Sequence, residues 1–409
     1  MSETDHTMPG AAPSIYPVVR LITALVLVTM GGAAMYGIIV VLKPVSFEFG
    51  VGRGVASLPY FMFMIVGGIG GVVMGRLADR FGVMLPALVG CVGLPAGMAG
   101  AAFAEEFWQF CVSLGVLSGL LGTSALFAPM AADISHWFTR RRGLAVAVVI
   151  TGTYFAGALW PPIVQASLDA RGWRETFVLI AILMAVVMLP LVALLYRKPA
   201  ALIEAQAARA APGAGRPLGV APGTLQCLIC AAGLGCCIAM AAPQVHIVAH
   251  VTDLGYAAQH GAAMLSLMLG TGIVSRIGSG FISDRIGGLR TLLLGSVLQA
   301  VTLAAFLGAD TLTLLYVVSA VFGLSQGGIV PSYTIIIRTF FPAHEAGRRV
   351  GWAMLFTFAG MALGGWMAGA LYDLTGSYTA SFINAVAFNV MNAAIVVFLA
   401  QRHRALATT

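Results

Sequence analysis

The segment Ser275–Gly287, with the sequence SRIGSGFISDRIG, decides how the rest of the chain is interpreted. It places one arginine, Arg276, inside an otherwise apolar run that ends in the acidic-basic pair Asp284-Arg285. At about 1.5 Å per helical residue, Arg276 would lie roughly 12 Å from that polar end, close to the middle of a bilayer. A charge at that depth is disfavoured by about 2.5–3.5 kcal/mol on insertion scales, so Arg276 is predicted to be functional.

The composition indicates a membrane protein. Hydrophobic residues make up 59% of the 409 residues and charged residues only 9%, with a mean hydropathy of +0.95. Soluble domains carry about 25% charged residues. The net charge of +7 does not indicate nucleic-acid binding, because the charges lie in short loops between apolar runs. The six cysteines all fall in apolar runs, where buried thiols are expected.

Apolar runs of about 20 residues recur along the chain, and each is long enough to span a bilayer. The predicted spans are 18–42, 57–75, 84–103, 108–133, 143–168, 175–196, 223–250, 259–283, 290–308, 312–337, 349–372 and 379–400. This pattern predicts an all-α membrane protein with two sets of six helices. The expected bundles are residues 1–196 and 222–409, joined by a linker over residues 197–221 that is rich in Ala, Pro and Gly.

Basic residues are distributed unequally between the two sides of these spans. Seventeen of the 22 Lys and Arg residues fall on the side that holds both termini and the linker, four fall on the other side, and Arg276 is left over. The positive-inside rule therefore predicts that both termini are cytoplasmic. Met1–Tyr16 lacks the basic region of a cleavable signal peptide. The expected location is a bacterial inner membrane.

The two halves of the chain repeat one another. Gly75–Gly82, GRLADRFG, follows the second span, and Gly280–Gly287, GFISDRIG, follows the eighth. The segments Gly172–Phe177 and Gly376–Phe382 precede spans six and twelve at nearly the same offset. A duplicated set of six spans is typical of transporters built from two bundles around a site at mid-membrane.

With this loop motif, the whole chain resembles the major facilitator superfamily. The copy at Gly75–Gly82 departs from the family pattern afterwards, because Val83 and Met84 stand where basic residues are usual, whereas the second copy keeps Arg290. The resemblance implies two pseudo-symmetric six-helix bundles, the major facilitator fold.

Within the superfamily, several stretches look like the group of monocarboxylate transporters and oxalate/formate antiporters. These are Phe47–Gly50 with Arg53, Trp137–Ala145, Pro243–His246, Ser275–Gly278 and Leu371–Tyr378. The resemblance implies that Arg276 is the carboxylate anchor. Oxalate/formate antiporters also carry a lysine in span eleven, and span 349–372 has none, which disfavours dicarboxylates.

The chemistry of arginine supports the same role for Arg276. A guanidinium presents a fork of donors that matches a carboxylate bidentately, and it keeps its charge. The alternative is a buried ion pair for packing, but no span carries an acid at comparable depth. The matching position in the first half is Gly71, so the charge is not part of the repeated scaffold.

Further candidates line the predicted inner spans. His246 and His250 lie one turn apart in span seven, and His246 is predicted to contact the substrate and to carry a proton. Packing against a neighbouring helix is the alternative for both histidines. Predicted cavity-lining residues, each with packing as the alternative, are Tyr36, Tyr154, Tyr333 and Phe356.

Charged residues near the predicted cytoplasmic ends of the spans are expected to form a gate. They are Asp79, Arg80, Asp133, Asp284 and Arg285, and the alternative is that they are solvated loop charges. We expect a secondary carrier that moves a small organic monocarboxylate by alternating access with a proton. A drug or metabolite exporter of the same fold remains open. Neither a cofactor, a metal nor an enzymatic activity is predicted, because no nucleophile-base or metal-ligand cluster is found.

Overall fold

A computed structural model describes residues 15–138, 142–196 and 220–407, and the described part is helical throughout. The first half contains α1 (Tyr16–Val40), α2 (Leu42–Glu48), α3 (Arg53–Ala56), α4 (Leu58–Phe81), α5 (Met84–Ala102), α6 (Phe107–Phe110), the π-helix η1 (Cys111–Thr123), α7 (Ser124–Trp137), α8 (Arg142–Arg171) and α9 (Trp173–Ala193). The second half contains α11 (Pro222–Asp253), α12 (Ala258–Ile286), α13 (Gly288–Phe306), α14 (Leu312–Gln326), α15 (Ile329–Phe340), α16 (Ala343–Thr375) and α17 (Thr379–Ala407).

Twelve helical segments in the described residues are long and apolar enough to cross a membrane. They confirm the predicted spans. Spans two, four and ten are each built from consecutive helical pieces, such as α14 and α15 on either side of Gly327 and Gly328. Helices satisfy their own backbone hydrogen bonds, which is why a chain of this composition adopts them in a lipid environment. Most of the predicted linker, residues 197–219, lies outside the described residues.

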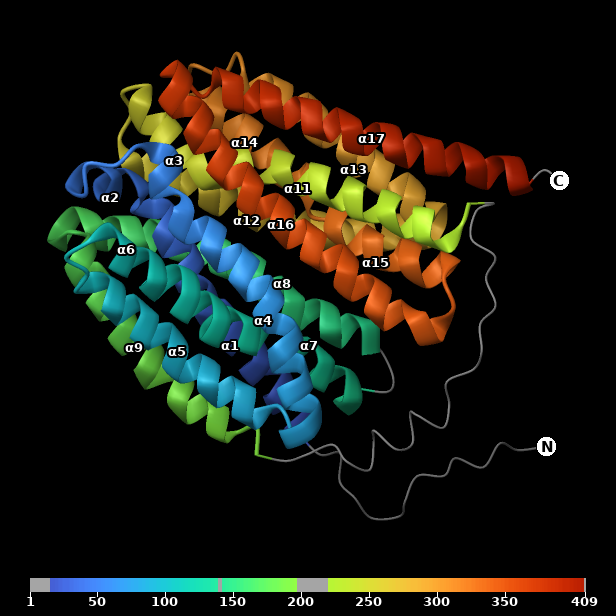
Figure 1. The fold of residues 1–409 in the computed structure, drawn as a ribbon, viewed down its shortest axis with the longest axis horizontal. Helices are drawn as coiled ribbons and strands as arrows, with labels where there is room; N and C mark the ends of the chain where they lie inside the picture. The colour runs from blue at the N-terminus through green and yellow to red at the C-terminus, as the bar shows by residue number, and fades with distance from the viewer. Residues whose placement is uncertain (1–14, 139–141, 197–219, 408–409) are drawn as a thin grey trace.

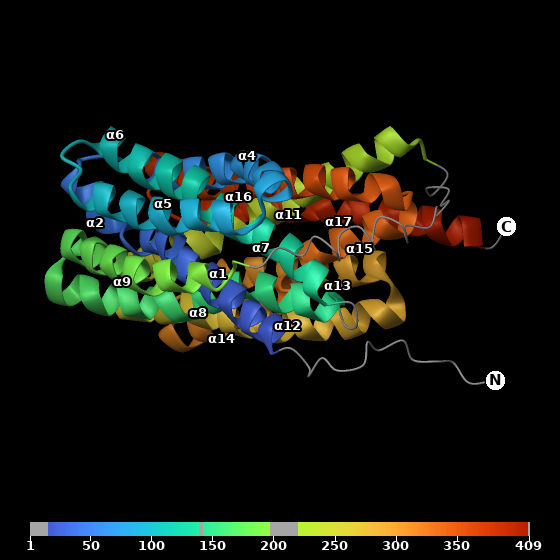
Figure 2. The same cartoon turned by 90° about the horizontal axis from the view of Figure 1, so that it is seen from below.

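The spans form two six-helix bundles that lie side by side (Figure 1). Helices α1–α9 form the N-terminal bundle and helices α11–α17 the C-terminal bundle. The start of α1 and the end of α17 lie at one end of the molecule, here called the terminal end, and α2, α3 and α6 lie at the other, here called the loop end (Figures 1 and 2). Across the interface α8 packs against α12, and α4 packs against α16.

The backbone carries the duplication seen in the sequence. The described glycines with positive φ form three pairs, Gly50 with Gly255, Gly82 with Gly287, and Gly172 with Gly376, at offsets of 204 or 205 residues. Gly82 and Gly287 end α4 and α12 with φ of 88° and 82°, and each amide donates to the carbonyl four residues earlier. Glycine adopts this conformation without a Cβ penalty, so both loop motifs end a span in the same way.

Glycines also set how closely the spans approach. Gly364 on α16 faces the backbone of Ile238 on α11, and a Cβ built there would lie 2.7 Å from Ile238 Cα. Since no lipid or water separates these backbones, the contact depends on dispersion at short range and on the absence of a side chain. Gly351, on the same helix, has open space where its Cβ would lie.

This contact predicts a difference between two glycine substitutions on one helix. Gly364→Ala should push α16 off α11 and lower the free energy of unfolding by about 1–3 kcal/mol, the usual cost of overpacking. Thermal denaturation of the purified protein in detergent measures the effect. Gly351→Ala is the matched control and should leave the melting temperature unchanged or raise it; equal effects of the two variants would contradict the close contact.

Candidate functional site

Arg276 lies where α12 meets both the other bundle and the break between α14 and α15. The break is in backbone contact with α12, because a Cβ on Gly327 would lie 2.6 Å from the Arg276 amide nitrogen and 2.8 Å from Ser275 Cβ. Only glycine allows that approach. The interrupted span therefore brings free backbone groups beside Arg276 near the middle of the bundle.

The guanidinium of Arg276 is half-buried, and the groups that hold it in the described part of the chain are neutral. Its Nε faces Gly327 O at 3.4 Å, and its Nη1 faces Ile150 O on α8 at 3.4 Å. Its Cζ lies 4.4 Å from the ring centroid of Tyr154, a cation–π arrangement. Within the described residues, none of the ion pairs involves Arg276. Both hydrogen bonds are long, so the cation retains donors for an anion.

Two of the predicted tyrosines lie beside this arginine. Tyr154 supplies the ring under Arg276, and Tyr36 on α1 donates its hydroxyl to Thr153 O at 3.2 Å. A Cβ on Gly157 would lie 2.5 Å from Tyr36 Oη and would also meet Leu269 of α12. The structure therefore brings Tyr36 of α1, Tyr154 of α8 and Arg276 of α12 together at the interface between the bundles.

The other predicted lining residues lie elsewhere. Tyr333 is 1% exposed within the C-terminal bundle and donates its hydroxyl to Asn392 Oδ1 at 3.0 Å. Phe356 and its neighbour Trp352 are exposed on α16. These positions match the packing alternative for Tyr333, whereas Phe356 is outside the cluster around Arg276.

The predicted gate residues lie at the terminal end in two different environments. Asp79, Arg80, Asp284 and Arg285 are exposed there. Asp133 is instead buried and forms a bidentate pair with Arg20 of α1, at 2.6 and 2.9 Å, within the N-terminal bundle. Its carboxylate thus ties α1 to α7, a contact that the spacing of the sequence did not predict.

His246 is fully buried and both of its ring nitrogens have partners. Nε2 lies 2.8 Å from Gly365 O on α16, and Nδ1 lies 3.0 Å from the hydroxyl of Tyr378. A carbonyl oxygen only accepts, so Nε2 carries the hydrogen, and in the neutral ring Nδ1 accepts from Tyr378. Burial raises the pKa of the Tyr378 phenol above its ordinary value, which keeps this donor neutral.

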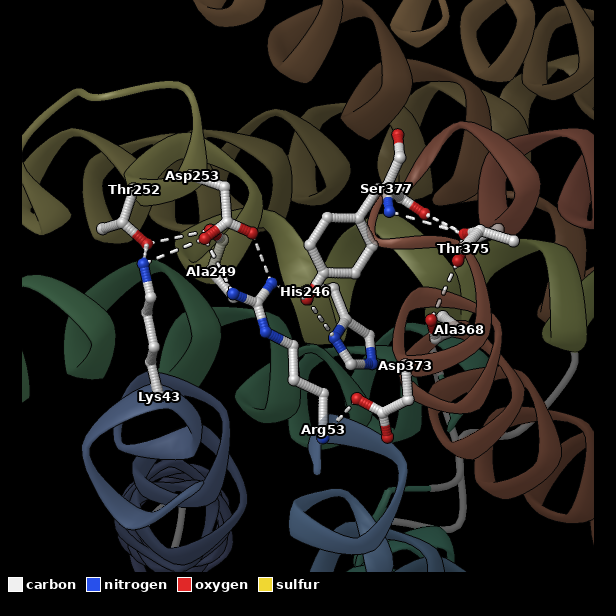
Figure 3. A network of polar contacts seen from close by, with 12 residues as sticks. Lys43, Arg53, His246, Ala249, Thr252, Asp253, Ala368, Asp373, Thr375 and Ser377 are labelled. Atoms are coloured by element: carbon white, nitrogen blue, oxygen red, sulfur yellow. Dashed lines mark hydrogen bonds and ion pairs between the residues drawn. The ribbon is translucent and has the colours of Figure 1, made fainter. Parts of the chain in front are cut away.

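Through Tyr378, His246 joins a network that ties the two bundles together at the loop end. Figure 3 shows His246, Arg53 and Asp253 in this network. Arg53, at the start of α3, forms a bidentate pair with Asp253 at the end of α11. Its Nη1 also donates to Tyr378 Oη at 2.9 Å, and its Cζ lies 3.7 Å from the ring centroid of Tyr372. The Arg53 side chain is only 10% exposed.

Two more contacts extend the network. Lys43 Nζ lies 3.0 Å from Asp253 Oδ1, a second ion pair between the bundles. The carboxylate of Asp373, at the end of α16, accepts the backbone N–H groups of Arg53 at 2.8 Å and Gly54 at 2.7 Å. Figure 3 shows these groups converging from both bundles. The loop end is therefore closed in this structure.

The contact of Asp373 with the other bundle has a counterpart at the matching position of the internal repeat. Asp169, at the end of α8, accepts a hydrogen bond from Gln259 Nε2 at the start of α12, at 2.7 Å. Asp169 and Asp373 differ by 204 residues, and Gly54 and Gln259 differ by 205. Each bundle thus uses an aspartate at the end of its fifth span to hold the start of the second span of the other bundle.

The sequence analysis named Arg53, Tyr372, Asp373 and Tyr378 only as parts of family-like stretches, and it did not predict that they meet. The available signal was the placement of each stretch at the same side of the membrane. Side-chain pairing across the two bundles cannot be obtained from span order alone, because it depends on how the bundles face one another.

These features define a class: a membrane transporter built from two related six-helix bundles. The model of the Major Facilitator Superfamily matches residues 22–309 and 227–408 of this chain. The chain belongs to the Major Facilitator Superfamily.

Curated relatives support this assignment. Monocarboxylate transporter 13 of Bos taurus is 30% identical over 335 residues, which cover 81% of this chain and 76% of the relative. Monocarboxylate transporter 13 of Rattus norvegicus is 28% identical over 340 residues, with the same coverage. MFS transporter asaE of Aspergillus flavus is 25% identical over 327 residues, covering 78% and 70%.

Solved structures share the fold. A bacterial homolog of the human lysosomal transporter Spinster, inward-facing and occupied, has a TM-score of 0.72 at 13% identity and covers 95% of this chain and 98% of its own. The peptide transporter POT in complex with sulfate has a TM-score of 0.69 at 15% identity and covers 94% and 95%. These likenesses confirm the predicted major facilitator fold.

The network at the loop end predicts that the Asp253 carboxylate contributes to its closure. Asp253→Asn removes the charge that pairs with both Arg53 and Lys43, and it leaves the Arg53 cation with little solvent. Losing one partner of a buried pair costs about 3–5 kcal/mol; because Asp253 is 23% exposed, we expect the lower end of that range. The closed state should lose population accordingly.

Spin labels at the exposed Phe103 and Leu307, one in each bundle, test this by pulsed dipolar spectroscopy. The exposed Cys227 is replaced by serine beforehand. Asp253→Asn should add longer distances. Glu48→Gln is the control, because Glu48 pairs with Arg174 inside the N-terminal bundle, and it should leave the distances unchanged. Unchanged distances in Asp253→Asn would show that the pair does not hold the loop end.

Proposed function

We propose that this protein is a secondary active transporter for small organic monocarboxylates, and that Arg276 anchors the carboxylate. The observation that carries the proposal is the environment of Arg276: a permanent cation between the bundles, without a carboxylate partner in the described part of the chain. Such a charge is costly inside a membrane. An anionic substrate supplies the missing partner, and apolar surroundings strengthen the pair.

The relatives and the charge count support a single carboxylate. The relatives named monocarboxylate transporters match about four fifths of this chain. Around Arg276 the described contacts include no second cation. One cation balances one negative charge, and a dicarboxylate would leave a second charge unpaired.

Alternating access supplies the transport step. The network of Arg53 with Asp253 closes the loop end, which we assign to the outer side because the terminal end carries most of the basic residues. The exposed charges at the terminal end, Asp79, Arg80, Asp284 and Arg285, together with Asp133, are the proposed gate on the cytoplasmic side. The two ends then close in turn around Arg276.

A proton is the proposed coupling ion. Uptake of an anion against an inside-negative potential costs about 2.3 kcal/mol per charge for each 100 mV. A proton carried along removes this cost, and His246 is the proposed carrier.

Proton binding by His246 would change the contacts that close the loop end. In the neutral ring Nδ1 accepts from Tyr378, whose oxygen also accepts from Arg53. A proton on Nδ1 turns this acceptor into a donor, so the Tyr378 oxygen would face two donors and its own hydrogen would lose its partner. The new charge would also repel Arg53, while Asp253 and Asp373 partly offset it. Protonation of His246 would therefore weaken the closed loop end, whereas neutral His246 would stabilise it.

Replacing Arg276 tests the anchor. Arg276→Ala should abolish uptake, and Arg276→Lys should lower it by roughly tenfold to hundredfold, because a charge-assisted hydrogen bond contributes about 1.5–3 kcal/mol and an ammonium lacks the fork. Uptake of radiolabelled monocarboxylates by proteoliposomes measures this. Arg402→Lys, at an exposed position near the end of α17, is the control. Full uptake by Arg276→Ala would refute the anchor.

Replacing His246 separates coupling from translocation. The amide of His246→Gln can keep a donor near Gly365 O but binds no proton at neutral pH. Uptake driven by an inward proton gradient should be lost, while exchange of labelled for unlabelled substrate without a gradient should persist. His260→Gln is the control, because His260 contacts Tyr316 inside the C-terminal bundle. Gradient-driven uptake that survives His246→Gln would exclude His246 as the carrier.

A further inference from the structure

Two buried glutamines in the C-terminal bundle form a hydrogen bond that none of the preceding roles uses. Gln244 on α11 donates its Nε2 to Oε1 of Gln326, the last residue of α14. The two residues are 7% and 0% exposed. An amide that is buried in an apolar span needs a hydrogen-bond partner, and here each glutamine supplies one for the other. The bond therefore ties the end of α14 to α11.

The amide of Gln326 is only partly satisfied by this bond. Its Nε2 has no hydrogen-bond partner among the described residues. Exchanging the assigned oxygen and nitrogen atoms of both amides would leave Oε1 of Gln326 without a partner instead. Two apolar side chains would fill the same place without leaving a buried polar group unsatisfied, so stability alone does not account for the pair.

Gln326 directly precedes the break in span ten that contacts Arg276. Gly327 O faces Arg276 Nε at 3.4 Å, and a Cβ on Gly327 would lie 2.6 Å from the Arg276 amide nitrogen. Gly328 is also seated on α12, because a Cβ there would lie 2.3 Å from Ser279 Cβ. A displacement of Gln326 would therefore move the carbonyl group that faces the guanidinium.

The orientation of the Arg276 side chain depends on this carbonyl because its other described contacts are weak. Ile150 O is also 3.4 Å away, and the ring centroid of Tyr154 lies 4.4 Å from Cζ. An arginine side chain has many rotamers, and none of the described ion pairs fixes this one. The position of Gly327 O is thus one of the few constraints on the direction of the guanidinium.

We propose that Gln244 and Gln326 are positioning residues for the substrate. Their hydrogen bond holds the end of α14, and through Gly327 it holds the guanidinium of Arg276 in the orientation that receives the carboxylate. The inference rests on the proposed function, in which Arg276 is the anchor. Neither glutamine needs to touch the substrate in this role, which agrees with their burial. A preorganised anchor loses less conformational entropy when the substrate binds.

Binding of acetate, propionate and benzoate to the purified full-length protein tests the positioning role by calorimetry. Methionine has nearly the length of glutamine but cannot form this hydrogen bond. Gln244→Met and Gln326→Met should each weaken binding by about threefold to tenfold, which corresponds to the cost of ordering one long side chain. In proteoliposomes KM for uptake should rise by the same factor, while the maximal rate should stay near that of the wild type.

The double variant separates positioning from a loss of stability. Each single substitution leaves one buried amide without its partner and should lower the melting temperature. Gln244→Met combined with Gln326→Met replaces both partners by apolar groups, so the melting temperature should recover. The affinity of the double variant should nevertheless stay as low as that of the single variants, because both substitutions remove the same bond.

Gln299→Met is the matched control for the loss of a buried amide. Gln299 is also fully buried, and its Oε1 has no partner among the described residues. Its Nε2 faces Cys236 O at 3.4 Å and not the break in span ten. Gln299→Met should therefore bind the three acids as the wild type does.

The outcomes distinguish the positioning role from the proposed function. If the wild type binds none of the three acids, or Arg276→Ala binds them equally well, the proposed function fails and the positioning role fails with it. If binding requires Arg276 but the double variant binds as the wild type does, the positioning role alone is wrong. It is also wrong if Gln326→Met weakens binding and Gln244→Met does not, since Gln326 would then act without its partner. Should a single variant not fold, the double variant decides.

Discussion

An ionised side chain inside the apolar part of a membrane needs a partner, and this requirement organises the described structure. Arg20 meets Asp133 within the N-terminal bundle, and Arg53 meets Asp253 across the loop end. Both pairs are bidentate, which suits the fork of the guanidinium. Arg276 is different, because the groups around it are carbonyl oxygens and an aromatic ring. The first two arginines hold helices together, and the third is the proposed anchor for the substrate.

Close backbone contacts at glycines hold the scaffold together and also position Arg276 in the site. Glycines allow the backbones of neighbouring spans to touch, as Gly364 does on Ile238 and Gly327 does on Arg276. Such contacts fix the position of a cation for which the described residues supply no counter-ion. In the site, the glycine break in span ten therefore positions Arg276 as much as the bonds of its guanidinium do.

The internal repeat explains why each bundle contributes an aspartate to the closed loop end. Asp169 and Asp373 occupy matching positions and each holds the opposite bundle. Onto this symmetric frame the chain adds asymmetric groups, namely Arg53 with its partners at the loop end and Arg276 at mid-membrane. His246 belongs to the first group, since Tyr378 links it to Arg53. The proposed link between proton binding and the loop end therefore requires no direct contact between His246 and the substrate.

The sequence by itself determined the twelve spans, the two bundles, the loop motifs and the exceptional charge at Arg276. These features follow from local properties, because hydropathy sets a span and a repeated motif sets a repeated turn. Only the tertiary structure decided the partners of Asp133, His246 and Arg53. Each of these depends on residues more than a hundred positions apart in sequence, and which faces of two bundles meet is set by packing and not by the pattern along one helix.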